Sequence, residues 1–237
     1  MPLFAIADLH LSFGADKPMD VFRGWENYTN RIEENWRACV SPEDTVVIGG
    51  DVSWAMSLGA VAPDFRFLQS LPGRKLIVKG NHDYWWDTVT KMNRFLGQQG
   101  FSSIAFIHNS AQAAEGVGIC GSRGWYNDGS EDRKILLREA GRLETSVSAA
   151  EKLGVEPVVF LHYPPFFGGA ECPEIMGVLR RHGIRRCYYG HLHGRAAAGA
   201  VEGMWNGIRF RLIACDHTGF APVRVETPLL PEVPGIG

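Results

Sequence analysis

Five short apolar runs divide the chain, and each one ends at a block of oxygen- or nitrogen-bearing side chains. The runs lie at Leu3–Ala7, Thr45–Ile48, Lys75–Val78, Pro157–Leu161 and Arg186–Tyr189. A short continuous apolar run between polar segments is typical of a strand that is buried on both faces of a sheet. Because longer polar segments separate the runs, the pattern predicts an α/β chain.

Helical spacing of apolar residues predicts helices at Trp25–Cys39, Ala62–Leu71, Asp87–Leu96 and Glu131–Leu153. In the first of these, one apolar face contains Tyr28, Ile32, Trp36 and Cys39. The stretches Ile104–Cys120 and Ile208–Val225 have strand-like patterns without a helix between them, which predicts some antiparallel pairing. No long linker divides the chain, so we expect one domain at 1–228 and a tail at 229–237.

Composition narrows the class of protein. The 24 basic and 26 acidic residues give a net charge of −2, whereas a generic nucleic-acid-binding protein has a strong basic excess. The five cysteines form no CxxC pair, which argues against a disulfide framework or a thiolate zinc site and favours a reducing cytoplasm. No apolar stretch approaches membrane-spanning length, and the N-terminus lacks the pattern of a signal peptide. We therefore expect a cytoplasmic protein without a membrane partner; its oligomeric state is not indicated.

The blocks that follow the apolar runs contain the side chains suited to chemistry. They are Asp8-Leu9-His10, Gly49-Gly50-Asp51, Gly80-Asn81-His82-Asp83, His162-Tyr163-Pro164-Pro165 and Gly190-His191-Leu192-His193-Gly194. In an open α/β sheet the carboxyl ends of the strands converge on one crevice, so these blocks should meet there. Carboxylate and imidazole groups suit divalent cations, and the absence of cysteine from the blocks argues against a structural zinc site.

Spacing within the blocks suggests how the side chains point. Residues two apart in an extended segment face the same side, so we expect Asp8 and His10 to point together, and likewise His191 and His193. Each glycine of the blocks, taken separately, is typical of an ordinary turn. Five of the eight histidines lie in the blocks, and this repetition favours metal ligation over isolated surface histidines.

The ordered set of blocks resembles the motifs of the calcineurin-like metallophosphoesterase superfamily. The matching motifs are Asp8-x-His10, Gly50-Asp51, Gly80-Asn81-His82-Asp83, His162 and Gly190-His191-x-His193. The resemblance implies a four-layer αββα sandwich of two mixed β-sheets flanked by helices. It also implies a hydrolase of phosphate esters that uses two divalent metal ions and a bridging hydroxide as the nucleophile.

The resemblance also implies a role for each residue. One metal would be held by Asp8, His10 and His193, and the other by Asn81, His162 and His191, with Asp51 bridging the two. His82 would be catalytic without being a ligand, either donating a proton to the leaving oxygen or stabilising the charge that develops there. Manganese, iron and zinc all accept such ligands, so the identity of the two ions stays open.

This sequence departs from the protein-phosphatase branch of the superfamily. In that branch the Gly-Asp block continues to an Asp-Arg pair, but here it reads Gly50-Asp51-Val52-Ser53-Trp54-Ala55. The carboxylate partner of the catalytic histidine and the phosphate-binding arginine are both missing, which argues against phosphoprotein phosphatase activity. Asp83 is adjacent to His82, but neighbours in an extended stretch point opposite ways, so Asp83 is not assigned as the partner.

Three residues outside the ligand blocks are candidates for substrate binding: Arg123, Arg195 and Trp54. An arginine can bind phosphate, and a tryptophan can stack on a ring of the substrate. For the aromatic residues near the blocks, which also include Tyr84, Trp85 and Trp86, packing in the interior is the favoured interpretation.

Three functions stay open at this point. The favoured one is hydrolysis of a small phosphorylated substrate, a phosphomonoester, phosphodiester or nucleotide. A nuclease would use the same site, although the near-neutral charge argues against nucleic acid without excluding it. A non-catalytic scaffold with the same fold would not need the full ligand set together with His82, and this chain has all of them.

Overall fold

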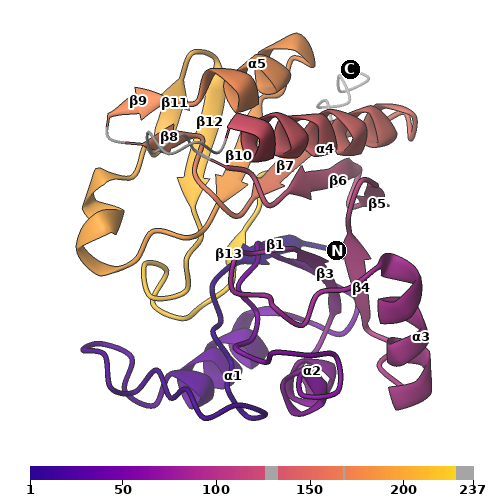
Figure 1. Ribbon diagram of the computed structural model, residues 1–237, viewed down its shortest axis with the longest axis vertical. Helices are drawn as coiled ribbons and strands as arrows, with labels where there is room; N and C mark the ends of the chain where they lie inside the picture. The colour runs from indigo at the N-terminus through magenta and orange to yellow at the C-terminus, as the bar shows by residue number, and fades with distance from the viewer. Residues whose placement is uncertain (126–132, 168, 228–237) are drawn as a thin grey trace, which may run out of the picture.

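The computed structural model describes residues 1–125, 133–167 and 169–227, so the expected tail at 229–237 lies outside the described residues. Two β-sheets face each other across the middle of the molecule, and helices cover the outer face of each (Figure 1). The N-terminal half of the chain forms most of one sheet with its helices, and the C-terminal half forms most of the other.

The first sheet has the order β13-β1-β2-β3-β4. Strands β1 to β4 are parallel, and β13 pairs with β1 in the antiparallel direction. Its strands are β1 (Leu3–Ile6), β2 (Thr45–Ile48), β3 (Arg74–Val78), β4 (Ile104–Ile107) and β13 (Val223–Arg224). The helices beside it are α1 (Tyr28–Cys39), α2 (Ala62–Ser70) and α3 (Val89–Gln99).

The second sheet has the order β11-β12-β10-β7-β6-β5, with four central parallel strands and an antiparallel strand at each edge. Its strands are β5 (Gln112–Ala114), β6 (Val117–Ser122), β7 (Glu156–Leu161), β10 (Arg186–Tyr189), β11 (Gly203–Trp205) and β12 (Ile208–Leu212). The helices α4 (Arg133–Glu151) and α5 (Pro173–Arg181) cover it. A two-stranded ribbon, β8 (Phe166–Phe167) with β9 (Ala170–Glu171), and a 3₁₀ helix η1 (Gly194–Gly199) complete the described elements.

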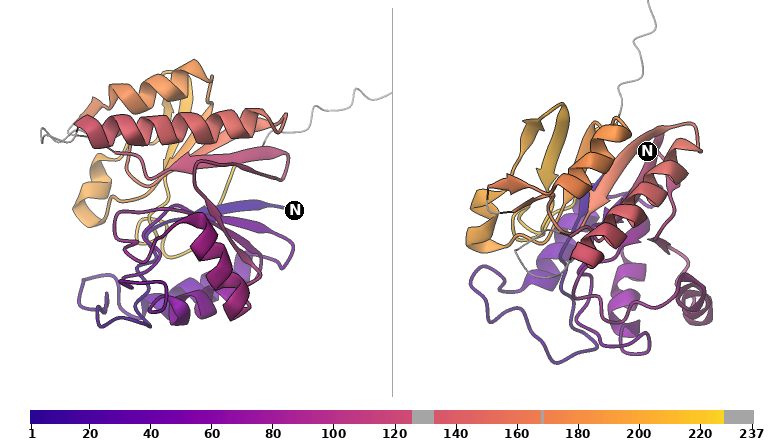
Figure 2. Two further views of the ribbon diagram at one scale, coloured as in Figure 1. Left: turned by 45° about the vertical axis from the view of Figure 1, so that its right-hand side comes forward. Right: turned by 45° about the horizontal axis from the view of Figure 1, so that its top comes forward.

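Three apolar clusters separate four layers, which Figure 2 shows stacked from helices to helices. Within β1, Phe4 and Ile6 pack toward the helices of the first half, while Leu3 and Ala5 pack between the two sheets. This alternation follows from the period of two of a strand, and it explains why a strand buried on both faces reads as a continuous apolar run. The expected sandwich of two mixed sheets flanked by helices is therefore confirmed.

Most of the expected elements occur where their patterns predict them. All five apolar runs are strands whose ends differ from the expected ends by at most one residue, and the expected antiparallel pairs are present. The four expected helices are also present; the first two residues of the range Glu131–Leu153 lie outside the described residues. On α1 the apolar face is narrower than expected, because Tyr28, Ile32 and Trp36 are buried but Cys39 is exposed.

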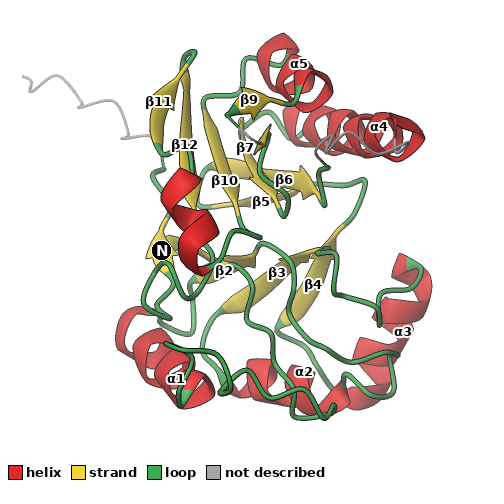
Figure 3. Cartoon of the chain, turned by 60° about the vertical axis from the view of Figure 1, so that its left-hand side comes forward, coloured by secondary structure: helices red, strands yellow, loops and turns green. Residues whose placement is uncertain are grey.

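Long loops, drawn in green in Figure 3, follow β1, β2 and β3 before the next helix begins. These loops carry three of the five ligand blocks, so the sheet fixes where the blocks start and the loops determine how they turn. Among the described residues, no helix is both long and apolar enough to cross a membrane.

Candidate metal centre

The ligand blocks meet at the carboxyl ends of five strands. Among the described residues, two groups of side chains each bring their ligand atoms within 4.8 Å of one another. One group is Asp8, His10 and His193, and the other is Asp8, Asp51 and His162. Asp8 belongs to both groups, so the two groups are adjacent. Asp8, His10 and Asp51 follow strands of the first sheet, whereas His162 and His193 follow strands of the second.

The backbone around the ligands is left-handed rather than extended. Positive φ angles occur at Asp8 (61°), His10 (46°), Asp51 (50°) and His191 (72°), four of the nine described non-glycine residues with positive φ. Asp8 and His10 belong to one group of ligands, as expected, but their backbone is left-handed and not the extended segment from which this was predicted. The amides of these two residues instead donate to the carbonyl oxygens of Gly50 (2.9 Å) and Asp51 (3.0 Å). Such costly conformations concentrate at functional sites.

At three glycines of the blocks, other atoms of the site lie so close to the backbone that a Cβ atom would not fit. A Cβ atom at Gly80 would lie 2.1 Å from Oδ1 of Asp51, and one at Gly190 would lie 2.4 Å from Oδ2 of Asp8. At Gly50, where φ is +95°, a Cβ would lie 2.8 Å from Nδ1 of His162. These positions therefore leave room for the carboxylates and imidazoles of the site and are more than ordinary turn glycines.

In the first group, the imidazoles of His10 and His193 point toward each other. Their Nε2 atoms are 3.4 Å apart, and Nε2 of His193 is 3.5 Å from Oδ1 of Asp8. Nδ1 of His193 donates to Asp216, at 2.8 Å, which leaves the Nε2 lone pair facing the group. Asp216 was missed by the sequence analysis; its only signal is its place just after the strand-like stretch that forms β12.

In the second group, His162 is held in the same manner. Its Nδ1 donates to the carbonyl oxygen of Gly49 at 3.2 Å, so the Nε2 of the neutral ring faces Oδ2 of Asp51 at 3.5 Å. The side-chain oxygen of Asn81 lies 2.5 Å from the same Nε2. The ring centroids of His191 and His162 are 5.1 Å apart, and the backbone amide of His191 donates to Oδ2 of Asp8 at 2.9 Å.

The electrostatics of the centre fit a bound cation. Asp8 is fully buried, and its Oδ1 has no hydrogen-bond partner among the described residues. Burial and the neighbouring Asp8 carboxylate raise the pKa of Asp51 to about 8. Burial lowers the pKa of His193, but its hydrogen bond to Asp216 and the negative charge of the nearby Asp8 outweigh this and raise it to about 10. Two buried carboxylates therefore attract a positive charge, which a proton supplies in the metal-free protein and which a divalent cation can replace.

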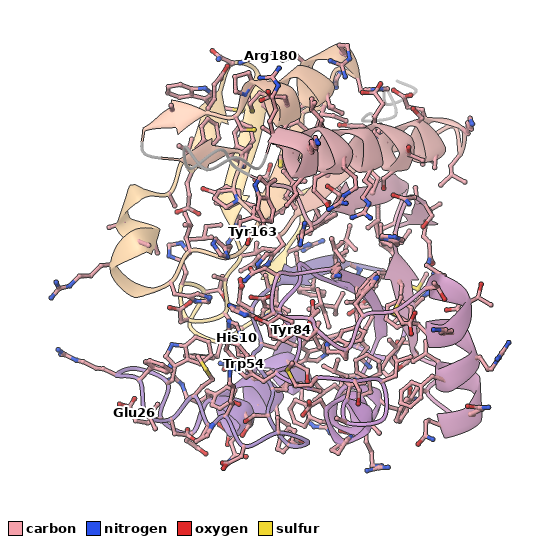
Figure 4. All side chains as sticks on the ribbon, viewed as in Figure 1. His10, Glu26, Trp54, Tyr84, Tyr163 and Arg180 are labelled. Carbon is pink, nitrogen blue, oxygen red and sulfur yellow. The ribbon has the colours of Figure 1, made fainter. Side chains whose placement is uncertain are left out.

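His82 lies next to the centre but belongs to neither group. Its amide donates to Oδ1 of Asp51 at 2.8 Å, and its Nδ1 lies 3.2 Å from the hydroxyl of Tyr84. Its ring is 4.4 Å from that of Trp54, which also stacks on His10 at 4.9 Å. Figure 4 labels His10, Trp54 and Tyr84, which lie close together where the N-terminal half of the molecule faces the C-terminal half.

The carboxylate of Asp83 binds backbone amides of two loops and does not orient His82. Its buried carboxylate accepts hydrogen bonds from the amides of Gly80 (2.7 Å), Val52 (2.9 Å) and Asp51 (3.0 Å), and from the indole of Trp85 (3.1 Å). Asp83 thus ties the loop after β2 to the loop after β3, and its position agrees with not assigning it to His82. Trp85 is buried in the core, as the packing interpretation predicts.

The three candidates for substrate binding lie in different places. Trp54 is in contact with the centre through His10 and His82. The guanidinium of Arg123 donates to Glu139 at 3.1 Å and lies over the ring of Trp125, at 4.7 Å. Arg195 is exposed at the start of η1. A role of either arginine in substrate binding stays a prediction.

A cavity of about 460 Å³ opens directly beside the centre. His10, His82 and His193 form its polar side, and its other side is apolar. That apolar side comes largely from the loop between β1 and α1, which the sequence analysis did not single out. The apolar lining residues are Met19, Phe22, Trp25 and Trp54.

The four-layer fold with candidate ligand groups at the strand ends is the arrangement expected of the metallophosphoesterase family. Residues 1–195 match the family model of the calcineurin-like phosphoesterases, and the chain belongs to this family.

Solved structures agree on the fold. The protein TT1561 of Thermus thermophilus superposes with a TM-score of 0.59 at 12% identity, covering 94% of this chain and 97% of that one. Phosphopantetheinyl hydrolase of Mycobacterium tuberculosis superposes with a TM-score of 0.51 at 14% identity, covering 96% and 98%. At these identities the likeness concerns the fold alone. No curated protein sequence matches the chain.

Proposed function

We propose that the chain hydrolyses phosphate esters with two divalent cations bound at the centre. Asp8, His10 and His193 would hold one cation, Asn81, His162 and His191 the other, and Asp51 both. The observation that supports this most is the pair of buried carboxylates, Asp8 and Asp51, next to the imidazoles of His162 and His193, whose outer nitrogens are already hydrogen-bonded. Such an arrangement leaves the inner lone pairs free to bind metal.

When bound, the cations would supply Lewis acidity toward the phosphate and an activated water. The protein supplies the orientation of the ligands, through Asp216 to His193 and through Gly49 to His162. His82 faces the same cavity as the ligands and has its Nδ1 next to Tyr84, so its Nε2 is available to donate a proton to the leaving oxygen.

The proposed substrate is a small phosphodiester or phosphomonoester. The cavity beside the centre has the size of a pocket for a small organic molecule, for which about 300–1,000 Å³ is typical. Nothing on the described surface favours a nucleic acid as a second candidate, and the cytoplasmic location stays a prediction.

The test is hydrolysis of a panel of phosphate esters after reconstitution with Mn²⁺ and after chelation. We expect turnover that needs the added metal and that falls by at least about 100-fold in Asp51→Asn, because this variant loses a charged ligand of both cations. Asp16→Asn, at an exposed position of the loop after β1, is the matched control and should keep full activity. Metal-loaded protein that hydrolyses none of the esters would refute the proposal.

A further inference from the structure

The apolar side of the cavity continues beyond the metal centre into a second hollow. Met19, Phe22, Trp25 and Trp54 line it, and a second hollow of about 280 Å³ continues outward along Met19, Phe22 and Trp54. Val21 and Pro18 line the second hollow as well. The two hollows share three residues, so one apolar groove leads from the candidate acid His82 to the surface.

The loop between β1 and α1 exposes apolar side chains to water, and a bound ligand would cover them. Phe22 is 55% exposed and Val21 is 73% exposed, although both are apolar and adjacent to each other in the chain. Exposed apolar side chains that border a groove mark a surface that becomes covered on binding. Because the groove starts at His82, the group that covers it must belong to the ester whose leaving oxygen His82 faces.

The two tryptophan rings of the groove already contact other side chains of the protein. The ring of Trp54 stacks on His10, at 4.9 Å, and has the amine of Lys17 over it, at 4.4 Å. The ring of Trp25 meets Tyr28 at 5.5 Å and Phe220 at 5.2 Å, and Trp25 is 5% exposed. Neither tryptophan therefore offers a free ring face for a stacked base, and the rest of the apolar lining is the phenyl ring of Phe22 and the flexible side chain of Met19.

The chemistry of the lining also selects against a polar occupant. Apart from His10, His82 and His193, the polar side chains that line the inner cavity are Arg23 and Asp216 among the described residues, and both oxygens of Asp216 already accept hydrogen bonds within the protein. A nucleobase or sugar in the groove would leave several of its donors and acceptors without partners, which is costly on removal from water. An alkyl or aryl group has no such groups to satisfy and gains by leaving water.

We infer that the substrate is a phosphate ester of an apolar alcohol, whose alkyl or aryl group binds in the groove of Met19, Phe22, Trp25 and Trp54. This inference rests on the proposed function, since it places the phosphate at the centre and the alcohol beside His82. Lys17 and Arg23 lie at the groove, where a second anionic group of the substrate would find a cation.

The first test is a homologous series of n-alkyl phosphates and methyl n-alkyl phosphodiesters, from ethyl to octyl. These alcohols are equally good leaving groups, so differences report binding of the chain. We expect kcat/KM to rise about two- to fourfold per methylene, since burial of one CH₂ is worth about 0.8 kcal/mol. Equal kcat/KM for the ethyl and octyl esters would overturn the inference while leaving the proposed function intact.

The second test needs no turnover. Calorimetric binding of n-alkylphosphonates to the Mn²⁺-loaded protein should tighten with chain length, and the heat-capacity change should become more negative. Phe22→Ala should reduce this dependence to less than half, whereas Phe13→Ala, an exposed apolar residue of the same loop outside both hollows, should leave it unchanged. Affinities that do not depend on chain length would overturn the inference, whether or not any ester is hydrolysed. So would an equal effect of the two variants.

Discussion

The carboxylate of Asp216 accepts a hydrogen bond from Nδ1 of His193 at 2.8 Å, and its second oxygen accepts the amide of Gly194 at 3.1 Å. These contacts fix both the ring and the backbone of one candidate ligand. Asp216 lies 23 residues after His193 and reaches it because β12 returns the chain to the same edge of the sheet.

Asp216→Asn is expected to weaken metal binding by about 10- to 100-fold, the usual effect of removing the carboxylate that holds a ligating histidine. The amide can accept the same hydrogen bond but carries no charge to increase the basicity of the ring. Competition with a metal-sensitive dye measures the affinity, with Asp16→Asn as the control. An unchanged affinity would mean that Asp216 has no part in holding His193.

Reconstituted protein should contain two divalent ions per chain by elemental analysis. Asp51→Asn should lower the occupancy of both sites, because Oδ2 of this carboxylate lies 3.9 Å from Nε2 of His10 and 3.5 Å from Nε2 of His162. Asp8→Asn should chiefly affect the site of His10 and His193, because Asp8 faces His162 only at Nδ1, which is already hydrogen-bonded to Gly49. A metal content of about one ion in the unmodified protein would contradict the two-ion arrangement. The measurement is independent of activity.

His82→Ala is expected to retain its metal and to lose about 10²- to 10⁴-fold in rate, the usual contribution of an acid–base group. Tyr84→Phe removes the hydroxyl next to Nδ1 and should cause a smaller loss, with KM unchanged. Parallel measurements of metal content and of kcat separate the roles. Loss of the metal in His82→Ala would show that this histidine is itself a ligand.

Phosphodiesters should be hydrolysed at least as well as matched phosphomonoesters. A monoester dianion carries more charge and is commonly held by an arginine, yet the guanidinium of Arg123 is bound to Glu139, and Arg195 is exposed on η1. Values of kcat/KM for an aryl monoester and its methyl diester decide the question. A monoester preference that disappears in Arg23→Ala would show that the loop after β1 supplies the missing arginine.

Stability should depend on pH through His182, which joins α5 to α4. Its Nε2 lies 2.7 Å from Glu144 and its Nδ1 lies 2.8 Å from Glu151. Partial burial lowers the pKa of His182, but the hydrogen bonds to these carboxylates outweigh it and raise the pKa. Its stabilising effect is therefore complete below the unfolded-state pKa of about 6.5 and is lost as pH rises through the folded-state value.

We accordingly expect His182→Gln to lower Tm by about 2–4 °C at pH 6, for an effect of about 1 kcal/mol, and by less at pH 9. Thermal unfolding followed by circular dichroism measures this difference. Arg180→Gln removes an exposed ion pair with Glu171 whose arginine stays charged across this range, so its effect should not change with pH. A His182→Gln effect of equal size at both pH values would contradict the assignment.

The sequence predicts the strands and the place of the ligands well, for one physical reason. Strands buried on both faces must be apolar throughout, so a polar block such as Gly50-Asp51 marks a strand end directly. Parallel strands then bring those ends together without further information. The helix α5 was missed although Ile175, Val178 and Leu179 have helical spacing, whereas α2, with the same nine residues, was predicted.

The rest depends on contacts between distant segments. The left-handed backbone at Asp8 is stabilised by Gly50 across two strands, and spacing along one strand carries no trace of it. The groove depends on Met19 and Phe22, which lie in a loop without periodicity, and on their meeting Trp54 from another loop. Such relationships are set by tertiary packing and not by local pattern.

The pairing of β13 with β1 has a consequence for biosynthesis. Leu3–Ile6 is translated long before Val223–Arg224, which covers its outer edge, and the amide and carbonyl of Ala7 bond to Ile213 and Cys215, which are also translated late. At about 5–20 residues per second, that edge stays open for roughly 10–45 seconds. During this interval a nascent chain offers an unpaired apolar strand edge to its neighbours, so chaperone occupancy on the ribosome should be governed by the appearance of β13.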